Sequence, residues 1–143
     1  MKNAVANIGV VVVAHGDLAE AMVNTAKSLL ANEDEQSTRS LAHCGVALTS
    51  SKDDSLELLS KTIKDLDQGA GVLVLADLFG GSAANLALSQ LGDGVEVVTG
   101  VNLAMVIDAI HHRSEDLGAL ANHVAHAATE SVIVANKLLK NAA

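Results

Sequence analysis

The chain of 143 residues has no tryptophan, tyrosine or proline, and it has only one phenylalanine and one cysteine. The shortage of aromatic rings argues against a platform for single-stranded nucleic acid, because such platforms stack bases on aromatic side chains. A basic surface for phosphate backbones is missing too, since 9 Lys and Arg stand against 17 Asp and Glu, for a formal net charge of −8. We therefore expect no nucleic-acid partner, and we expect protein partners with basic faces.

The single cysteine, Cys44, excludes an internal disulfide and a zinc site built from several thiolates. It is expected to be a small buried residue within a strand, which is typical of a protein of the reducing cytoplasm. Long hydrophobic runs are also absent, because the run from Ile8 to Ala14 is far shorter than the roughly 18 residues of a membrane span. We predict a cytoplasmic protein without direct membrane insertion, and the length predicts one domain over residues 1–143.

What the sequence does contain is an alternation of apolar, β-branched runs with amphipathic segments of helical period. The four consecutive valines at 10–13 are typical of a strand that is buried on both faces. Strands are predicted at 10–13, 41–48, 72–75 and 95–99, with a short terminal strand at 132–134. Helices are predicted to begin near residues 17, 53, 82, 103 and 117, and the one that begins near 82 is expected to continue through Leu91. This order predicts an α/β fold with a doubly wound, mostly parallel sheet of strand order 2-1-3-4 and helices on both faces.

Polar residues and glycines follow the first and third predicted strands abruptly. In such sheets, ligands bind outside the carboxyl ends of the strands, where the strand order reverses. His15 follows the first strand and Asp77 follows the third, so we expect them side by side. A carboxylate that accepts a proton from one imidazole nitrogen leaves the other nitrogen free as a nucleophile or a general base.

Gly80, Gly81 and Ser82 precede a predicted helix, so their N–H groups and the hydroxyl favour an anion site that lacks a lysine. A plain glycine turn with Ser82 as a helix cap explains the same residues equally well. Asn85 and Asn102 either border this crevice or serve as cap and turn residues. The segment also resembles part of a nucleophile elbow, which keeps a small serine hydrolase using Ser82 open, although the last glycine of that motif is missing.

The common cofactor signatures are absent from the sequence. It contains neither glycine-rich nucleotide motif and no His-Glu-x-x-His, and neither key loop has a Lys or Arg to clamp a triphosphate. His123 and His126, with His111 and His112 nearby, are spaced as metal ligands, but no supporting carboxylate pattern accompanies them, so a solvated helix face is favoured. We predict no cofactor and no metal.

Three segments taken together resemble a known family. They are the strand from Gly9 that runs into Ala-His-Gly-Asp-Leu-Ala-Glu-Ala, the stretch Val72 to Asn85 with Ala-Asp-Leu-Phe-Gly-Gly-Ser-Ala-Ala-Asn, and Thr99-Gly-Val-Asn-Leu-Ala-Met105. The similarity is to the enzyme IIA domain of the mannose (mannose/fructose/sorbose) family of the bacterial phosphoenolpyruvate-dependent sugar phosphotransferase system. It extends over essentially the whole chain.

The resemblance implies a phosphotransferase component with a phosphohistidine intermediate. His15 would accept the phosphoryl group from the histidine-containing phosphocarrier protein, Asp77 would hydrogen-bond the ring, and Gly80 to Ser82 would contact the phosphate. The group would then pass to a IIB component, expected on a separate polypeptide, on its way to a sugar. Relatives of the mannose type exchange a C-terminal strand, so we also predict a homodimer in which the segment from Ser131 to Ala135 joins the sheet of the partner subunit.

The sequence departs from the family's pattern at three alanines. Ala83 and Ala104 stand where the family commonly has proline at a helix start, which alanine tolerates. Ala76 stands where a threonine is frequent, and this leaves Ser82 as the evident side-chain hydroxyl of the site. The phosphotransfer subunit of a dihydroxyacetone-kinase-like system, which shares the fold and the early histidine, is the alternative function.

Overall fold

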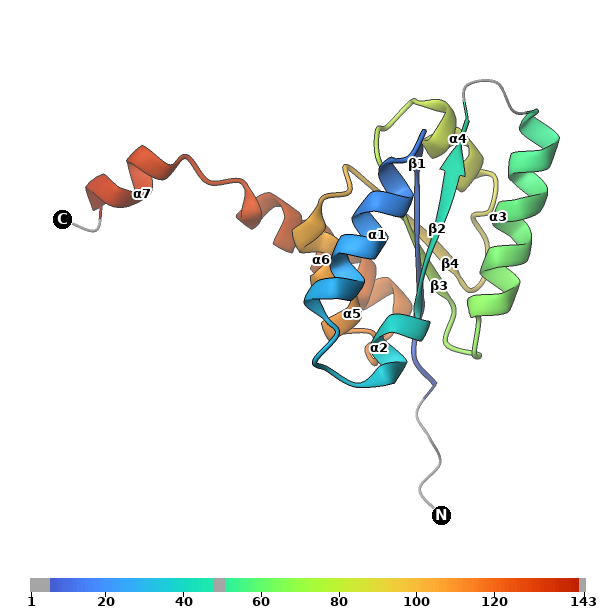
Figure 1. Ribbon diagram of the computed structural model, residues 1–143, viewed down its shortest axis with the longest axis horizontal. Helices are drawn as coiled ribbons and strands as arrows, with labels where there is room; N and C mark the ends of the chain where they lie inside the picture. Colours follow the sequence, from blue (N-terminus) through green and yellow to red (C-terminus); the bar gives the residue numbers. More distant parts are fainter. Residues whose placement is uncertain (1–5, 48–50, 142–143) are drawn as a thin grey trace, which may run out of the picture.

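A computed structural model describes residues 6–47 and 51–141, which form a four-stranded sheet between two layers of helices (Figure 1). The elements are β1 (Gly9–His15), α1 (Leu18–Leu29), α2 (Glu35–Arg39), β2 (Leu41–Val46), α3 (Lys52–Leu66), β3 (Val72–Ala76), α4 (Ser82–Leu88), β4 (Val95–Thr99), α5 (Leu103–His111), α6 (Leu117–Ser131) and α7 (Ala135–Asn141). The sheet has the order β2-β1-β3-β4 with every strand pair parallel, which confirms the predicted fold class and strand order.

The strand β1 lies in the middle of the sheet, between β2 and β3, and is buried from Gly9 to Ala14. Successive side chains of a strand point to opposite faces, so its valines divide between two cores. Val10 and Val12 pack with residues of α1, α5 and α6, whereas Val11 and Val13 pack with residues of α3 and α4. Each fully buried valine contributes about 1.5–3 kcal/mol relative to an exposed one, which explains why the strand is so uniformly apolar.

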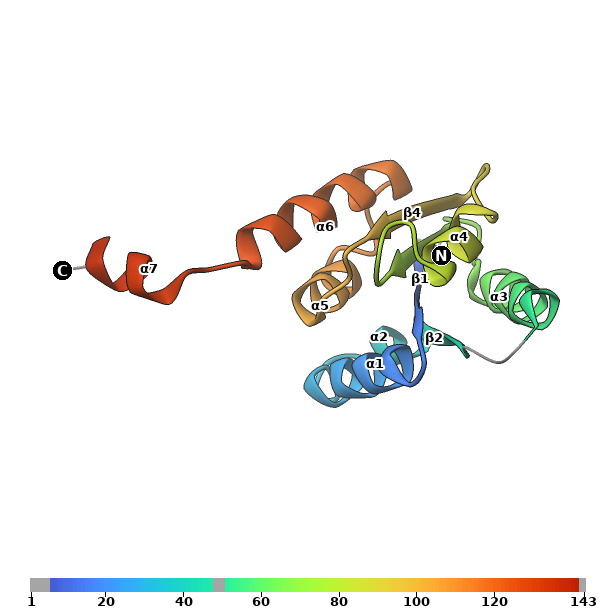
Figure 2. The same cartoon turned by 90° about the horizontal axis from the view of Figure 1, so that it is seen from above.

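The two helical layers are unequal (Figure 2). The helices α1, α5 and α6 cover one face of the sheet, and α3 and α4 cover the other. Within the second layer the buried residues of α4 are all alanines, at 83, 84 and 87, while Leu86 packs against the same core from a partly buried position. The small alanine side chains let the helix lie close to β1 and β3, so the loop that leads into α4 is held over the carboxyl ends of both strands.

Burial also determines the protonation state of the single cysteine. Cys44 lies in β2 with its side chain inside the core, as expected from the sequence. Burial raises the pKa of its thiol, so the reactive thiolate is disfavoured. Cys44 is therefore a packing residue.

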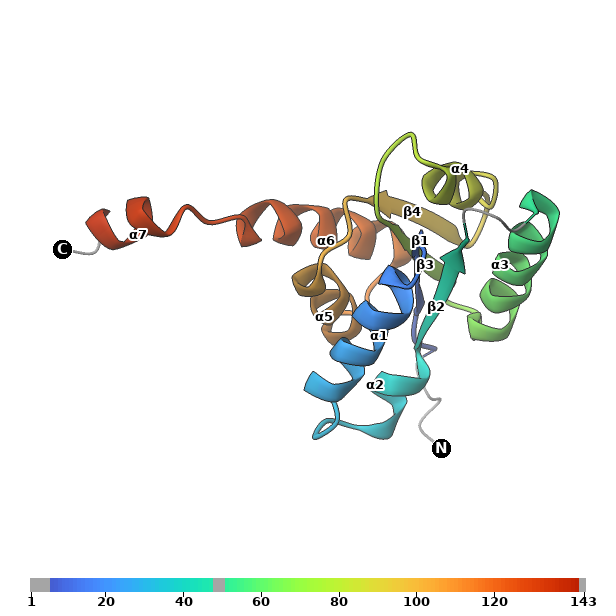
Figure 3. The ribbon, with the colours of Figure 1, turned by 45° about the horizontal axis from the view of Figure 1, so that its top comes forward.

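The C-terminal part of the chain leaves the domain after α6 (Figure 3). Residues 132–134, which the sequence analysis predicts to pair with a partner subunit, pair with no strand of their own sheet. They lead instead into α7, a helix that the sequence analysis missed, as it missed the short α2. None of the helices in the described part of the chain has both the length and the apolar character to cross a membrane.

Two predicted boundaries also change. The helix expected to continue through Leu91 ends at Leu88, where Ser89 already serves as its C-cap. The strand predicted to end at residue 48 ends at Val46, and residue 48 itself lies outside the described residues. Neither change moves the loops that follow β1 and β3.

Candidate functional site

The carboxyl ends of β1 and β3 bring His15 and Asp77 together. The two strands are parallel neighbours with Val13 opposite Ala76, and His15 and Asp77 are the residues that follow that last pair of the register by one or two positions. The ring Nδ1 of His15 lies 2.6 Å from Asp77 Oδ2. The predicted pairing is therefore confirmed, and it joins two residues that are 62 positions apart in the chain.

The Asp77 carboxylate is held by three hydrogen bonds. Besides the bond to the ring, Oδ2 accepts from the backbone N–H of His15 at 3.0 Å, and Oδ1 accepts from the backbone N–H of Leu78 at 2.8 Å. Burial by itself raises the pKa of the Asp77 carboxyl, but the hydrogen bonds from His15 and Leu78 outweigh burial and lower the pKa below its ordinary value. The group is thus ionised at neutral pH, and the stability it contributes is lost as the pH falls through this lowered pKa.

The charge of Asp77 determines the tautomer of His15. An ionised carboxylate only accepts hydrogen bonds. Nδ1 of the ring therefore carries the proton and donates a hydrogen bond to Oδ2. The lone pair then resides on Nε2, which lies 2.9 Å from the hydroxyl oxygen of Ser82. The side chain of His15 is 29% exposed, so Nε2 is an accessible nucleophile whose orientation is fixed from behind.

The loop of Gly80, Gly81 and Ser82 surrounds the outer part of the ring. Gly80 has a φ of +82°, a conformation that other residues rarely adopt, so the turn requires a glycine. At Gly81 a Cβ atom would lie 3.1 Å from Cε1 of His15, so this glycine leaves space for the ring. Ser82 is the first residue of α4 and makes the only direct side-chain contact of the three with His15 that the structure describes.

The two candidate asparagines have different surroundings. Asn102 is the N-cap of α5, where its side-chain oxygen accepts from the N–H of Met105 at 2.9 Å, so its role is the structural one. Asn85 lines a surface cavity of about 390 Å³ beside α4, which Ser82 also borders. The other residues of its lining are Val46, Ala47, Lys52, Asp53, Ser55, Leu56, Leu86 and Ser89. His15 does not line this cavity.

Large apolar side chains flank His15 on the surface instead. Leu18 follows β1 and is 47% exposed, while Leu78 and Phe79 follow β3 and are 63% and 79% exposed. Exposed apolar side chains gathered beside reactive groups are typical of protein-binding surfaces. The site is therefore built to meet another protein more than to enclose a small substrate.

The side chains of Ser82, His15 and Asp77 are hydrogen-bonded in the order found in serine hydrolases. The hypothesis that Ser82 lies in a nucleophile elbow therefore needs a separate test. A nucleophile elbow holds its serine in a strained turn, whereas Ser82 begins a regular helix. In the part of the chain that the structure describes, no residue other than glycine has a positive φ. The strained geometry of an elbow is therefore missing.

The histidines singled out as metal ligands are distributed differently from expectation. His126 is exposed on α6, and Nε2 of His111 lies 2.8 Å from Glu33 Oε1. His112 and His123 come together, and Asp108, which the sequence analysis did not consider, completes the group. Its position four residues before His112, one helical turn away, was the available signal.

Comparisons with known proteins agree with this geometry. Residues 9–127 match the model of the EIIA-man family, described as the PTS system fructose IIA component. The chain is 34% identical over 107 residues to the transcriptional regulatory protein LevR of Bacillus subtilis, which covers 72% of this chain and 11% of LevR. It is 29% identical over 111 residues to the PTS system mannose-specific EIIAB component of Escherichia coli K12, which covers 76% of this chain and 33% of that protein. The chain thus spans a third or less of these curated relatives.

Solved structures share the fold over nearly their whole length. The PTS IIA protein associated with the fucose utilization operon of Streptococcus pneumoniae superposes with a TM-score of 0.78 at 26% identity, over 93% of this chain and 96% of that one. The mannose/sorbose-specific IIA subunit of Enterococcus faecalis superposes with a TM-score of 0.77 at 24% identity, over 90% and 94% of the two chains. Because its identity is only 24%, the likeness to the Enterococcus faecalis subunit shows a shared fold.

Proposed function

The chain belongs to the EIIA-man family of PTS IIA components, and from this membership we propose that it is a phosphoryl carrier of a sugar phosphotransferase system in the cytoplasm. In this proposal Nε2 of His15 accepts a phosphoryl group from the histidine-containing phosphocarrier protein and passes it to a separate IIB component. One observation carries the assignment to Nε2. The hydrogen bond that His15 Nδ1 donates to Asp77 Oδ2 keeps the ring proton on Nδ1, and so the lone pair of the ring lies on Nε2, in a side chain that is 29% exposed.

The transfer is a displacement at phosphorus. The lone pair of Nε2 forms a new N–P bond while the N–P bond of the donor breaks, and the electron pair of that bond returns to the donor imidazole. Because Nδ1 keeps its proton, the ring of His15 becomes cationic as the new bond forms. The ionised Asp77 stabilises this charge from 2.6 Å, and the reverse sequence of bonds delivers the group to the IIB component.

The loop of Gly80 to Ser82 is proposed to contact the transferred group. Ser82 Oγ lies 2.9 Å from Nε2, so its hydroxyl can turn from the ring nitrogen to a phosphoryl oxygen when the N–P bond forms. Ala76 offers no second hydroxyl here, and no Lys or Arg belongs to either loop. A carrier that must release its cargo needs only such modest retention.

The proposal is tested by incubating the protein with phosphoenolpyruvate, enzyme I and the phosphocarrier protein. Intact mass spectrometry should show a gain of one phosphoryl group that is labile to acid and stable to base, and addition of a IIB protein should remove it. Labelling of Ser82 by a fluorophosphonate, without any phosphoryl gain, would support the small hydrolase instead.

A regulatory role is the second candidate function, because the relative with 34% identity is a transcriptional regulatory protein. The same His15 chemistry would then serve as a signal, or would supply a dihydroxyacetone-kinase-like system. Discharge to the IIB component separates the alternatives. A chain that accepts the group from the phosphocarrier protein but passes none to a IIB protein is a regulator or a kinase subunit.

Gly81→Ala should slow phosphoryl transfer without unfolding the protein. Its φ of −80° suits alanine, but the new Cβ would lie 3.1 Å from Cε1 of His15 and would push the ring away from Ser82. Gly80→Ala is the matched control, because no atom lies within 4 Å of its added Cβ and only the φ of +82° is strained, at a cost of about 1–3 kcal/mol of stability. Transfer rates and thermal unfolding of both variants separate the two effects. Equal transfer rates in Gly81→Ala and the wild type would contradict the assigned position of the ring.

The exposed C-terminal segment is the proposed dimer contact. Val132, Ile133 and Val134 are 78%, 58% and 59% exposed, and Leu138 and Leu139 of α7 are 57% and 67% exposed. Val132 has extended backbone angles, and residues 132–134 pair with no strand of their own sheet, so a strand edge of a second copy can supply backbone partners. Light scattering at low micromolar concentration should then give about twice the chain mass of 14.6 kDa.

Deletion from Ser131 onward should yield a monomer or an aggregate, because it removes the pairing segment together with α7. Deletion from Asn136 onward is the control, since it keeps the whole segment from Ser131 to Ala135, removes nearly all of α7 and should leave the dimer intact. A monomeric full-length chain would end the exchange hypothesis and leave the His15 chemistry untouched, because that site lies on β1 and β3 of one chain.

A further inference from the structure

Three side chains of types that bind metal ions come together where α6 packs on α5, outside the site of His15. Asp108 and His112 belong to the C-terminal part of α5 and the residue after it, and His123 belongs to α6. One ligand atom from each, a carboxylate oxygen and two ring nitrogens, all lie within 4.8 Å of one another. The rings of His112 and His123 have centroids 4.1 Å apart and are tilted by 39°.

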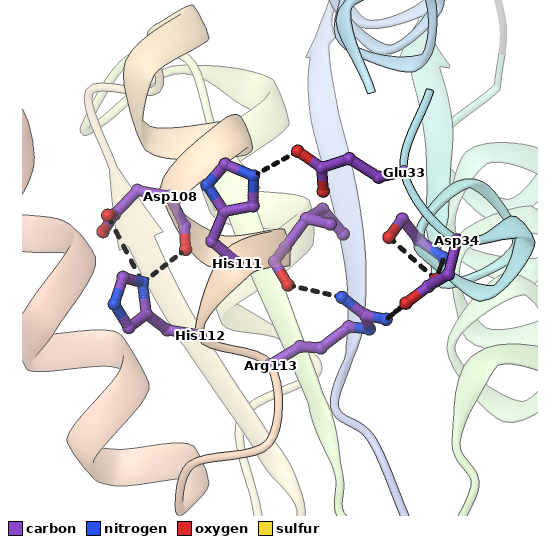
Figure 4. A network of polar contacts seen from close by, with 8 residues as sticks. Glu33, Asp34, Asp108, His111, His112 and Arg113 are labelled. Carbon is purple, nitrogen blue, oxygen red and sulfur yellow. Dashed lines mark hydrogen bonds and ion pairs between the residues drawn. The ribbon is translucent and has the colours of Figure 1, made fainter. Parts of the chain in front are cut away.

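The carboxylate of Asp108 is shared by both imidazoles. Figure 4 shows that Nδ1 of His112 contacts both Oδ1 and the backbone carbonyl of Asp108. The two distances are 3.4 Å and 3.0 Å, and Oδ2 lies 3.0 Å from Nε2 of His123. Oδ2 is buried, yet among the described residues no donor approaches it in a direction that makes a hydrogen bond. A buried carboxylate oxygen without such a bond is costly, and a bound cation removes that cost.

Within residues 6–47 and 51–141, no Lys or Arg forms an ion pair with Asp108. Figure 4 shows His111 and Arg113 on the other side of the chain, directed to Glu33 and Asp34. Arg113 donates to the carbonyl of Ile110 at 2.7 Å and lies 3.3 Å from Asp34 Oδ1. The titratable groups that face Asp108 are therefore the two imidazoles, and an imidazole binds a metal ion in its neutral form.

We propose that Asp108, His112 and His123 form a binding site for a divalent cation of the zinc class. Two imidazoles and one carboxylate are a common donor set for Zn²⁺, with bonds of about 2.0–2.2 Å and a fourth position left to water. In a tetrahedron with such bonds the ligand atoms are about 3.4 Å apart, so a pair at the 4.8 Å limit would have to close by about 1.4 Å when the ion binds. The side chains are 23%, 38% and 39% exposed, which lets an ion enter from solvent.

A bound ion would clamp α6 onto α5. The helix α6 leads directly into the segment 132–134, so the clamp would fix the direction in which the C-terminal segment leaves the domain. The site is separate from His15, and it needs neither phosphoryl transfer nor a dimer to be occupied.

The test uses the full-length protein, stripped with a chelator and titrated with ZnCl2 by calorimetry. We expect one equivalent to bind and the thermal midpoint of unfolding to rise by several degrees, because the ion binds only the folded arrangement. His123→Ala and Asp108→Asn should each weaken binding at least about 10-fold, which is the lower range even for changes around a metal site. His126→Ala, on the same helix and exposed, is the matched control and should bind as the wild type does.

A second measurement covers variants that fold poorly. Co²⁺ added to the unmodified protein should give the visible absorption of a tetrahedral site, and ZnCl2 should displace it. Two results would overturn the proposal: unchanged Zn²⁺ affinity in both His123→Ala and Asp108→Asn, or loss of the bound equivalent only in His15→Ala, which would place the ion at His15 and Asp77.

Discussion

His15→Ala is expected to abolish phosphoryl uptake from the phosphocarrier protein completely. In the proposed transfer the nucleophile is Nε2, whose orientation depends on the bond of Nδ1 to Asp77 and on the position of the ring beside Gly81. The other five histidines lie elsewhere, and none that the structure describes contacts Asp77 or Ser82. Intact mass spectrometry after incubation with the donor proteins measures the result.

The fold should survive this substitution, because His15 is the last residue of β1 and its side chain is partly exposed. His126→Ala serves as the control for histidine content and should be phosphorylated at the wild-type rate. A phosphoryl group on the His15→Ala protein, or peptide mapping of the wild-type group to Ser82 or another histidine, would show that the proposed function is wrong in its central residue.

Asp77→Asn is expected to slow transfer in both directions by about 100-fold or more, the range found when a preorganised electrostatic contact is removed. The neutral amide cannot balance the positive charge that develops on the ring of His15. It also cannot satisfy its neighbours, because Asp77 accepts from His15 on one oxygen and from Leu78 on the other. Whichever way the amide turns, its NH2 group faces a donor, at a cost of about 1–3 kcal/mol.

Rapid-quench transfer assays with the phosphocarrier protein and the IIB protein measure this effect. Asp17→Asn is the matched control, because it removes the same charge two residues from His15. Asp17 is exposed and its side chain makes no capping bond to α1. Wild-type transfer rates in Asp77→Asn would remove Asp77 from the mechanism, and equal slowing in both variants would assign the effect to overall charge.

Much of the site was predictable because it depends on chain direction. An uninterrupted run of valines can only be buried, and parallel strands place their carboxyl ends at one edge, so His15 and Asp77 were predicted as neighbours before any distance was known. Which ring nitrogen of His15 carries the proton was not predictable in the same way. It depends on the N–H groups of His15 and Leu78, which lower the pKa of Asp77 and carry no signal in the sequence.

The C-terminal prediction depends on a second copy of the chain and stays a prediction. Three β-branched residues at 132–134 favour an extended backbone, and Val132 has extended backbone angles. A strand also needs a neighbour to pair with, and a single sequence does not show whether the chain reaches one. The cluster of Asp108, His112 and His123 was predicted only in part, because the sequence analysis named both histidines but missed Asp108, one helical turn before His112. The meeting of His123 with the other two depends on the packing of α6 on α5, which the sequence does not show.

The position of Phe79 provides a spectroscopic signal for the binding of a partner protein. Its ring is the only benzene ring of the chain, and it is 79% exposed in the loop that follows Asp77. A protein without tryptophan or tyrosine is almost silent in near-ultraviolet absorption and fluorescence, so signals from tryptophan or tyrosine in a mixture belong to the partner. The phenylalanine resonances in a proton spectrum come from this one ring, and their shift on addition of an unlabelled partner would follow docking beside His15 without any attached probe.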